Sequence, residues 1–378
     1  MSALSIEFAA EAPQRVLYAC RALGVPDHDR CSGLAGSGRR VLGLVWPRDR
    51  DYIWDLPVPA RFEMREVGPA RDTGVGWARA ALRFWGAALR FRPDVALVYG
   101  YQDPVLLGLA VLLRARGTLV LSMNDSKFDD YGRRVAREAL KALFLLPYQG
   151  ILAATPRAAD YARFLGRRRV ELYACAIDTG RVAAGAREAF AAAAFGERYF
   201  LAVARFVPKK NHMRLLDLYE GYLRRAAAPR RLRLVGYGGL EGQVAARIAA
   251  SELLSRHVSL EGYRSAAEMP AVLGGALALL LPSVEEQFGI VVTEALACGV
   301  PVILSPACGA TVLVEDFVNG FVVDPENGEG WIAAMERMGS EPEWRRMSAR
   351  CPAAARAADT AVFLGALARL EAAARRKE

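Results

Sequence analysis

Short apolar runs alternate with longer amphipathic or polar stretches along most of the chain. The runs at 276–281 and 300–304 predict buried strands, and the segment 290–297 between them, which opens at Gly289, predicts a helix. Comparable runs, each followed by a polar or glycine-containing loop, predict further strands at 15–19, 40–46, 94–99, 118–122, 200–204, 231–235 and 258–261. Strands that alternate with helices predict parallel sheets covered on both faces. We therefore expect an α/β fold.

Other segments predict loops, helices and a domain junction. Residues 26–30 and 46–76 are rich in charge and proline and predict long loops. The stretches 133–146 and 353–374 predict helices, the first of them basic. An alanine-rich stretch interrupts the strand pattern at 178–196, where we expect the link between two domains. At 378 residues the chain is long enough for two domains with sizeable cores.

The predicted helix at 290–297 follows a strand and a loop that contains Glu286. A helix that opens at the carboxyl end of a strand presents free backbone N–H groups and the positive end of its dipole, so it suits a phosphate group. Glu286 is expected on the loop that faces the ligand, and Glu294 lies within the helix. Carboxylates placed in this way accept hydrogen bonds from sugar hydroxyls, although both would equally suit a solvated surface.

The segment from Pro282 to Val302 resembles the Glu-x7-Glu signature of retaining glycosyltransferases with the GT-B architecture, and its Phe-Gly, Glu-Ala-Leu-Ala and Gly-Val-Pro-Val neighbours are similar to family 4. The resemblance implies that Glu286 contacts the donor sugar and that Glu294 holds the ribose. It also implies that the diphosphate lies against the amides that follow Phe288, which are those of Gly289, Ile290 and Val291.

Three more segments fit the same resemblance. Arg205 and Lys210 stand five positions apart in a basic loop after a strand, like the pair that binds the donor diphosphate in this family, although Asn211 replaces the more usual glycine. The turn at Gly236 lacks the spacing of a dinucleotide fingerprint and resembles the Val-Gly-x-Gly turn of the donor domain. Gly262 and Tyr263 resemble the turn that flanks the nucleobase, and Tyr263 would equally suit the core.

The first half of the chain resembles the family only in patches. Many members carry a histidine about where Tyr101-Gln102-Asp103 stands here, so the acceptor-side chemistry has no direct counterpart. Asp125, Ser126 and Lys127 lie in a loop similar to one of a bacterial polysaccharide subset and are, with Gln102, the acceptor-side candidates. A helix-capping network is the alternative explanation for this loop. A second departure is Val312, where relatives usually carry an acidic residue.

The resemblance implies two Rossmann-like domains that face a central cleft. We expect an acceptor-binding domain at 1–180 and a donor-binding domain at 181–352, with a C-terminal helix at 353–378 that packs back on the first domain. The implied activity is retaining, metal-independent transfer of a sugar from a UDP- or GDP-sugar to a glycan or lipid-linked acceptor in envelope or exopolysaccharide biosynthesis. No cofactor is expected beyond this donor.

Charge and composition bear on partners and location. The formal net charge is +9, which suits anionic sugar nucleotides and anionic membrane surfaces. Arginine clusters at 79–92 and 163–169 near the apolar segment 105–113 favour peripheral attachment to the inner face of the plasma membrane, unless these are only a solvated face and a buried helix. Six scattered cysteines and no signal peptide indicate a reducing cytoplasm, with Cys298 and Cys308 as packing residues. The three histidines share no ligand spacing, so no metal site is expected.

Two other functions stay open. A nucleotide-sugar epimerase of the same architecture would use the same phosphate site, but it needs acidic or histidine groups placed for proton abstraction. A non-enzymatic nucleic-acid-binding protein would explain the charge alone and lacks interleaved aromatic residues or a recognised module.

Overall fold

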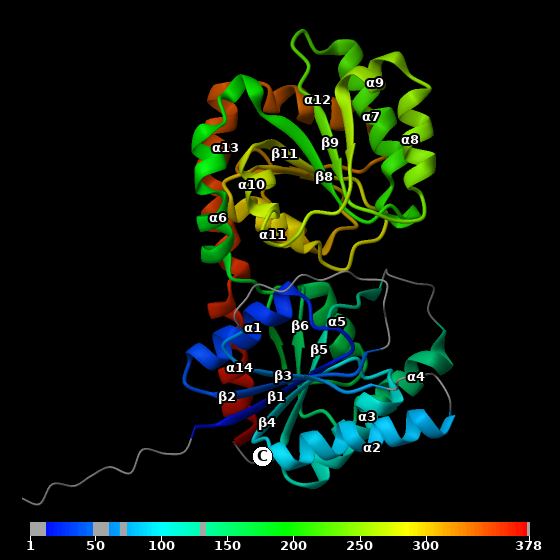
Figure 1. Cartoon of the computed structure of the whole chain (residues 1–378), viewed down its shortest axis with the longest axis vertical. Coiled ribbons are helices and arrows are strands. Elements are labelled where there is room, and N and C mark those ends of the chain that lie inside the picture. The colour runs from blue at the N-terminus through cyan, green and yellow to red at the C-terminus, as the bar shows by residue number, and fades with distance from the viewer. Residues whose placement is uncertain (1–12, 48–59, 69–73, 129–133, 376–378) are drawn as a thin grey trace, which may run out of the picture.

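The computed structural model describes residues 13–47, 60–68, 74–128 and 134–375. Two parallel β-sheets, one in each half of the chain, form the centres of two α/β domains stacked along the long axis (Figure 1). Helices cover the sheets, as the alternation of strands and helices predicts. The expected α/β architecture with two parallel-sheet domains is confirmed.

The first sheet has seven strands in the order β3-β2-β1-β4-β5-β6-β7. Its strands are β1 (Arg15–Cys20), β2 (Arg40–Val45), β3 (Glu63–Glu66), β4 (Val95–Tyr99), β5 (Leu119–Asn124), β6 (Gly150–Ala153) and β7 (Val170–Leu172). The second sheet has six strands in the order β10-β9-β8-β11-β12-β13. Its strands are β8 (Tyr199–Val203), β9 (Leu232–Val235), β10 (Val258–Glu261), β11 (Ala276–Leu281), β12 (Val302–Leu304) and β13 (Gly320–Val322).

Strand order reverses once in each sheet, between β1 and β4 and between β8 and β11. In open α/β sheets, ligands bind in the crevice outside the carboxyl ends of the strands at this reversal. The loops after these four strands are therefore the positions at which a site is expected.

The helices begin and end as follows: α1 (Val25–Gly36), α2 (Gly74–Phe91), α3 (Pro104–Ala115), α4 (Val135–Phe144), α5 (Pro156–Phe164), α6 (Thr179–Ala192), α7 (His212–Arg225), α8 (Glu241–Ala249), α9 (Glu252–His257), α10 (Met269–Gly274), α11 (Ile290–Ala297), α12 (Gly328–Met338), α13 (Glu341–Ala355) and α14 (Thr360–Arg375).

Local sequence explains where several of these helices start. The Asp103 carboxylate accepts a hydrogen bond from the Val105 amide at 2.9 Å, and Pro104 occupies the first turn of α3. Thr155 caps α5 in the same manner.

The loop predicted at 26–30 is wrong, because these residues form the first turns of α1. Pro26 is compatible with a first turn, and Asp27 accepts a hydrogen bond from the Gly24 amide at 2.9 Å. The charges are buried and compensated rather than solvated, since Asp27 pairs with Arg30 and Asp29 with Arg181. The loop predicted at 46–76 contains β3 and the start of α2, and its residues 48–59 and 69–73 lie outside the described residues.

The chain passes twice between the two sheets. The first passage follows β7 and leads into α6, and the second lies between α13 and α14. Backbone hydrogen bonds join them, with the Ile177 amide donating to the Ala358 carbonyl at 3.1 Å and the Thr360 amide to the Ile177 carbonyl at 2.9 Å. The single helix predicted at 353–374 is wrong in this respect, because it is broken at 356–359. Helix α14 lies against α1 and β7 of the first sheet (Figure 1).

Candidate functional site

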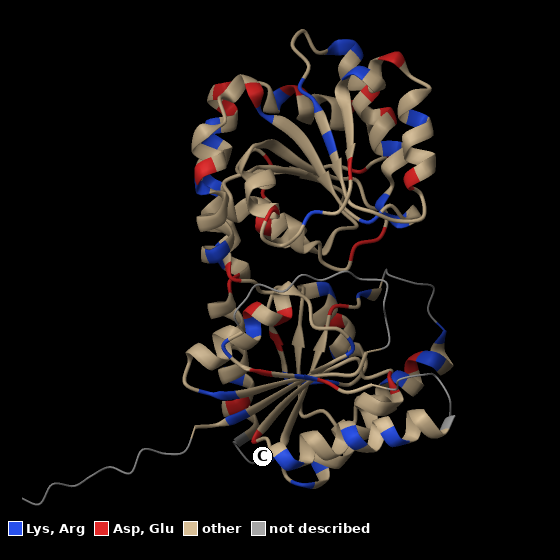
Figure 2. Cartoon of the chain, in the orientation of Figure 1, with Lys and Arg blue, Asp and Glu red and all other residues tan. Residues whose placement is uncertain are grey.

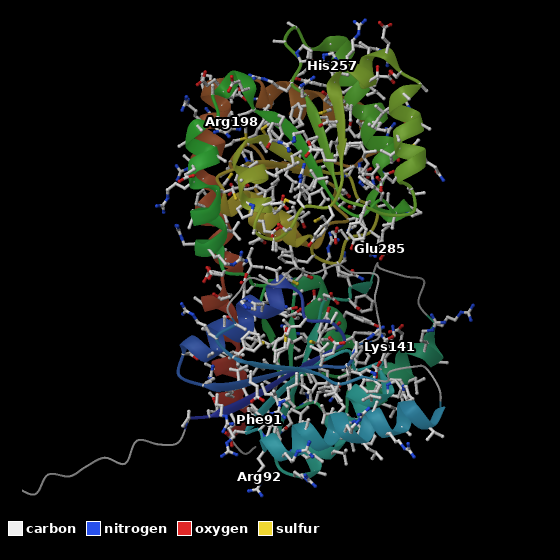
Figure 3. All side chains as sticks on the ribbon, in the orientation of Figure 1. Phe91, Arg92, Lys141, Arg198, His257 and Glu285 are labelled. Carbon is white, nitrogen blue, oxygen red and sulfur yellow. The ribbon has the colours of Figure 1, made fainter. Side chains whose placement is uncertain are left out.

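Two loops at the strand reversal of the second sheet bring the predicted catalytic residues together. Lys210 follows β8 and Glu286 follows β11, and their ammonium and carboxylate groups form an ion pair. A parallel pair lies beside it, in which Lys209 donates to Glu285 at 3.0 Å. Glu285 lies on the side of the C-terminal domain that faces the N-terminal domain (Figure 3). The more buried of the two pairs is Lys210 with Glu286.

Asn211 holds these two loops in place. Its backbone is left-handed, with φ of 59°, a conformation that glycine adopts freely and asparagine tolerates better than most residues. Its side-chain amide donates to the Pro282 carbonyl at 3.2 Å, and the Val284 amide donates to the Lys209 carbonyl at 2.9 Å. Asparagine therefore satisfies the backbone requirement that explains glycine in relatives and adds a tie between the loops.

The amino end of α11 is the predicted phosphate position. Gly289 precedes the helix with φ of +90°, and a Cβ there would lie 2.9 Å from the Cys308 Sγ atom. Phe288 is buried, and its carbonyl accepts a hydrogen bond from the Ala310 amide at 2.7 Å. Ile290 and Val291 occupy the first turn, where backbone N–H groups have no intrahelical acceptor. The chain therefore turns sharply at Gly289 and leaves the backbone amides of Ile290 and Val291 at the end of the loop.

Arg205 lies half-buried in the loop after β8, and the glycine turn after β9 packs directly against this loop. Gly236 has φ of +151°, and a Cβ on it would lie 2.0 Å from the Ala204 carbonyl oxygen. Gly238 is equally confined, because a Cβ there would meet the Phe206 carbonyl oxygen at 2.6 Å. Both glycines are required by close approach of two backbones.

Gly262 and Tyr263 follow β10 and differ from that turn. A Cβ on Gly262 would meet no atom within 4 Å, and the residue is exposed. The Tyr263 ring is half-buried and lies edge-on to Tyr237 with centroids 5.9 Å apart. The space above Gly262 is open in the protein, so the fold itself does not demand glycine there.

Glu294 is half-buried on α11 and faces charges from two other elements. Burial raises the pKa of Glu294 to about 7, opposed by Arg181 and reinforced by Asp29. Asp29 on α1 and Arg181 on α6 themselves form an ion pair at 2.7 Å. Sequence reasoning missed Asp29 and Arg181, which lie 152 residues apart. The only signal was an unusual density of charge at the start of α1.

The acceptor-side candidates occupy the first domain's edge. The Tyr99 hydroxyl donates to Asp125 at 2.7 Å, and the Ser126 amide donates to the Asn124 side chain at 3.1 Å. Gln102 is exposed and donates to the Tyr101 hydroxyl at 3.2 Å. The N-cap of α4 is Arg134, which makes no side-chain capping bond, so these residues do not cap α4. Residues 129–133, between this loop and α4, lie outside the described residues.

Lys127 crosses between the domains. Its side chain is 1% exposed, and its ammonium donates to the Glu286 carbonyl at 2.7 Å and to the Ala307 carbonyl at 2.9 Å. The carbonyl of Glu286 thus binds a first-domain lysine while its carboxylate pairs with Lys210. The backbone of the predicted sugar-contacting residue is therefore held from both domains.

Cysteine and histidine side chains are buried in and around the site. All six cysteines are unpaired and buried, and burial raises the pKa of Cys298 and Cys308 to about 12. Burial and the neighbouring Lys210 lower the pKa of His212 to about 4. Within residues 13–47, 60–68, 74–128 and 134–375, no cluster of three or more His, Cys, Asp or Glu side chains is placed to hold a metal ion. Nor does this described part contain a helix long and apolar enough to cross a membrane.

Sequence comparison matches the second half of the chain to a known family. Residues 187–357 match the family of glycosyl transferases group 1. D-inositol 3-phosphate glycosyltransferase of Nocardiopsis dassonvillei is 40% identical over 70 residues, which are 18% of this chain and 16% of that protein. O-antigen chain mannosyltransferase B of Escherichia coli is 27% identical over 150 residues, which are 40% of this chain and 39% of that protein. The matched regions thus span well under half the length of these curated relatives.

Structural comparison extends over nearly the whole chain. Sucrose-phosphate synthase from Thermosynechococcus elongatus has a TM-score of 0.73 at 18% identity, covering 96% of this chain and 100% of that chain. HepE of Anabaena in complex with UDP-glucose has a TM-score of 0.74 at 14% identity, covering 95% and 99%. At these identities the likeness shows the fold, which is the GT-B arrangement of two facing domains.

Proposed function

Because residues 187–357 match the family of glycosyl transferases group 1 and nearly the whole chain has the GT-B fold, we propose that this protein transfers a sugar from a nucleoside diphosphate sugar to a hydroxyl acceptor. The observation that carries the proposal is the meeting of Lys210 and Glu286 at the strand reversal of the second sheet, beside the amino end of α11. A cation, a carboxylate and free amides at one strand edge suit a diphosphate joined to a polyhydroxylated ring.

The proposed reaction breaks the bond between the anomeric carbon and the diphosphate oxygen and forms a bond from the same carbon to the acceptor oxygen. Arg205, Lys210 and the amides of Gly289, Ile290 and Val291 stabilise the charge that develops on the departing diphosphate. A diphosphate oxygen takes the acceptor proton, and the configuration at the anomeric carbon is retained. With this charge balanced by the protein, we expect a metal chelator to leave turnover unchanged.

The other residues position the donor. Glu286 orients the sugar hydroxyls, Glu294 accepts hydrogen bonds from the ribose, and the open space above Gly262 admits the base beside Tyr263. Gly236 holds the Arg205 loop by close backbone contact. In the protein without donor, Lys210 and Glu286 neutralise each other, so the donor must take over both partners as it binds.

The substrate classes follow from chemistry and from the relatives. The donor base is uracil or guanine, and HepE is a fold neighbour whose structure holds UDP-glucose. We propose a glycan or a lipid-linked sugar as acceptor, supported by the O-antigen mannosyltransferase among the relatives. Gln102, Asp125 and Ser126 are the side chains proposed to face it from the first domain, with Lys127 at the junction.

The first prediction uses two neighbouring ion pairs as test and control. Lys210→Met and Glu286→Gln are expected to lower kcat/KM for transfer by about 100-fold or more, because each removes charge at the reacting diphosphate or sugar. Lys209→Met and Glu285→Gln remove the adjacent pair and should stay within about threefold of wild type. The measurements are initial rates with UDP- and GDP-sugars and thermal stabilisation by UDP and GDP. An equal loss of kcat/KM in the variants of both ion pairs would overturn the assignment of Lys210 and Glu286 to the donor site.

The epimerase alternative is separated by the acceptor. A transferase consumes the donor with an acceptor present and forms a new glycoside, whereas an epimerase converts the donor when it is alone. Conversion of UDP- or GDP-sugar to its epimer without acceptor would replace the proposed function.

A further inference from the structure

Helix α4 turns Glu138 and Lys141 inward and several of its large apolar side chains outward. Glu138 is 7% exposed and accepts a hydrogen bond from the Tyr161 hydroxyl of α5. Lys141 donates to Glu138 at 3.1 Å and to the Tyr161 hydroxyl at 2.9 Å. These polar contacts attach the helix to the domain, with Lys141 on its flank (Figure 3). An ordinary surface helix buries its apolar stripe instead.

The outward side of α4 and the loop after it carries large apolar side chains. Val135 is 89% exposed, Leu143 59% and Leu146 61%, and Leu140 is also exposed. Positions 135, 139, 143 and 146 recur at helical spacing and so lie along one stripe. Removing such side chains from water is favourable, so an uncovered apolar stripe indicates a partner.

Aromatic residues extend this surface onto α5 and toward the cleft. Phe164 is 62% exposed, and its ring lies 5.0 Å from that of Phe128, which is itself exposed. Phe128 also lies 5.0 Å from Tyr161, the residue that anchors α4. It directly follows Lys127, whose ammonium contacts the second domain. Phe128 and Phe164 thus form a second exposed apolar pair, which lies beside the anchor of α4 and next to the interdomain contact.

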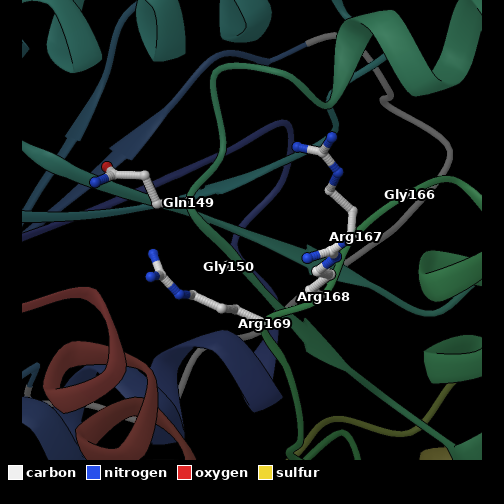
Figure 4. A pocket seen from close by; sticks show the side chains of 6 residues that line it. All are labelled: Gln149, Gly150, Gly166, Arg167, Arg168 and Arg169. Carbon is white, nitrogen blue, oxygen red and sulfur yellow. The ribbon is translucent and has the colours of Figure 1, made fainter. Parts of the chain in front are cut away.

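Cations border the same surface. Arg134 and Arg137 are exposed at the start of α4, and Figure 2 shows basic residues on this helix. At its other end, Arg167 donates to the Leu145 carbonyl at 3.1 Å, and its buried Nε has no hydrogen-bond partner. Arg167, Arg168 and Arg169 line a hollow of about 200 Å³ together with Gln149, Gly150 and Gly166 (Figure 4). The neighbouring acid Asp160 is already paired with Arg163.

We propose that α4, Phe164 and the arginines around the hollow form a docking surface for an anionic lipid bilayer. An exposed apolar stripe between cationic residues matches the acyl boundary and the phosphate layer of such a membrane. The apolar side chains enter the headgroup boundary, and the arginine hollow binds lipid phosphate. A symmetric dimer through this surface would bring the arginines of both copies into one interface, whereas an anionic bilayer supplies the opposite charge.

The surface differs from the one that the sequence indicated. The apolar segment 105–113 belongs to α3, and its residues Val105, Leu106, Leu109, Ala110 and Leu113 are buried in the core. That segment is thus the buried helix and not a membrane contact. The arginines at 163–169 keep their place in the proposal, now beside α4.

The docking has one consequence for catalysis, which rests on the proposed function, whereas the docking itself does not. An acceptor anchored in the bilayer would present its sugar at the edge of the cleft beside Phe128. The enzyme would then act on a lipid-linked acceptor without extracting it from the membrane.

Vesicle binding of the full chain tests the proposal without any sugar nucleotide. The protein should sediment with equimolar phosphatidylcholine and phosphatidylglycerol vesicles and bind pure phosphatidylcholine much more weakly. The double variant Leu143→Gln, Leu146→Gln is expected to lose roughly tenfold or more in partitioning. The double variant Arg137→Gln, Arg168→Gln should bind anionic vesicles more weakly than wild type. Added salt should weaken the binding of wild type in the same way. Met213→Gln, with a methionine 38% exposed on α7 of the second domain, is the matched control and should bind as wild type.

The outcomes separate cleanly. Absence of binding to anionic vesicles, or an equal loss of binding in Met213→Gln, overturns the docking surface. Concentration-dependent dimerisation that the Leu143→Gln, Leu146→Gln variant abolishes, without vesicle binding, assigns the surface to a second copy and also overturns the proposal. Transfer to a water-soluble acceptor should be unchanged in these variants, so a failed glycosyltransferase assignment would not be confused with failed docking.

Discussion

Individual buried charges in this protein are compensated by residues distant in sequence. Asp29 binds Arg181 of α6 and also accepts a hydrogen bond from the Asp178 amide at 3.0 Å. Arg30 donates to the Ala176 carbonyl at 3.2 Å. Burial raises the pKa of Glu294 to about 7, with Arg181 opposing this rise and Asp29 adding to it. Its protonation is therefore sensitive to pH near neutrality.

The second prediction concerns Glu294 in the protein without ligand. Between its ordinary pKa of 4.5 and about 7, the folded chain keeps a proton that the unfolded chain has lost, so stability falls as pH rises through this interval. Glu294→Gln should remove about 1–3 kcal/mol of that fall. The measurement is chemical denaturation at pH 5 and pH 8. His212 acts in the opposite direction, because its lowered pKa makes the folded protein less stable as pH falls below 6.5. Wild type and Glu294→Gln both contain His212, so its contribution is the same in the two proteins.

A control fixes the interpretation of this result. Glu252 on α9 is highly exposed, and Glu252→Gln should keep the wild-type difference between the two pH values. If Glu294→Gln also keeps this difference in stability between pH 5 and pH 8, burial does not disfavour the ionised Glu294 carboxylate, and the expectation from the structure is wrong.

At the scale of elements, the turns at the strand ends differ in what they need glycine for. The turn after β9 is pressed against the loop after β8, whereas the turn after β10 is open. Sequence alone assigns both to the donor site by resemblance. The structure separates a glycine required by packing from one that leaves room above it.

The third prediction compares these two glycines. Gly236→Ala is expected to cost about 2 kcal/mol or more of folding stability, because it combines a positive φ with a clash against the Ala204 carbonyl. Gly262→Ala should change stability by less than about 0.5 kcal/mol. If the base binds above this turn, Gly262→Ala should also weaken nucleotide affinity about tenfold, or about 1.4 kcal/mol. Denaturation and nucleotide titration measure both. Stability loss in Gly262→Ala would contradict the open space, and unchanged affinity would move the base elsewhere.

At the scale of the whole molecule, the two domains are joined by the crossing segments at Ile177 and Asp359, by the ion pair between Asp29 and Arg181, and by Lys127. The Thr179 amide donates to the Asp359 carboxylate at 3.2 Å, which reinforces the crossing. The Lys127 contact consists of one buried side chain and two carbonyls, so it is a smaller connection than the crossing segments. Hinge closure in two-domain proteins turns on a few such residues.

The fourth prediction is that Lys127→Met opens the cleft. Two carbonyls lose a charged donor, at a cost of about 1.5–3 kcal/mol to the interdomain contact, while the crossing segments remain. Small-angle scattering should show a larger radius of gyration than for wild type. Arg157→Gln is the matched control, since Arg157 also reaches a second-domain carbonyl, that of Pro306, but is exposed and at 3.4 Å. An unchanged radius in Lys127→Met would show that the remaining interdomain contacts, including the Asp29–Arg181 ion pair and the crossing segments, set the arrangement without it.

Local sequence was sufficient where apolar runs are bounded by turn residues. The prediction of a strand at 276–281 and of a helix at 290–297 agrees with β11 and α11 at both ends, because each apolar run is buried on its own sheet or helix face. The loop with Lys210 comes after the end of β8, and the loop with Glu286 comes after the end of β11. Parallel topology then explains why the two loops meet, since neighbouring strands end at the same edge.

Tertiary structure alone decided the rest. Proline and charge at 26–30 suggested a long loop, and only partners such as Arg181, on another element, allow these residues to form a helix with buried charges. The basic segment before Leu146 predicted a helix but not that Glu138 would turn inward toward Tyr161. Lys127 was assigned to the acceptor side, and its contact with the Glu286 carbonyl spans 159 residues. Local patterns report which residues are apolar and how they repeat, whereas the compensation of a charge depends on groups that folding brings from elsewhere.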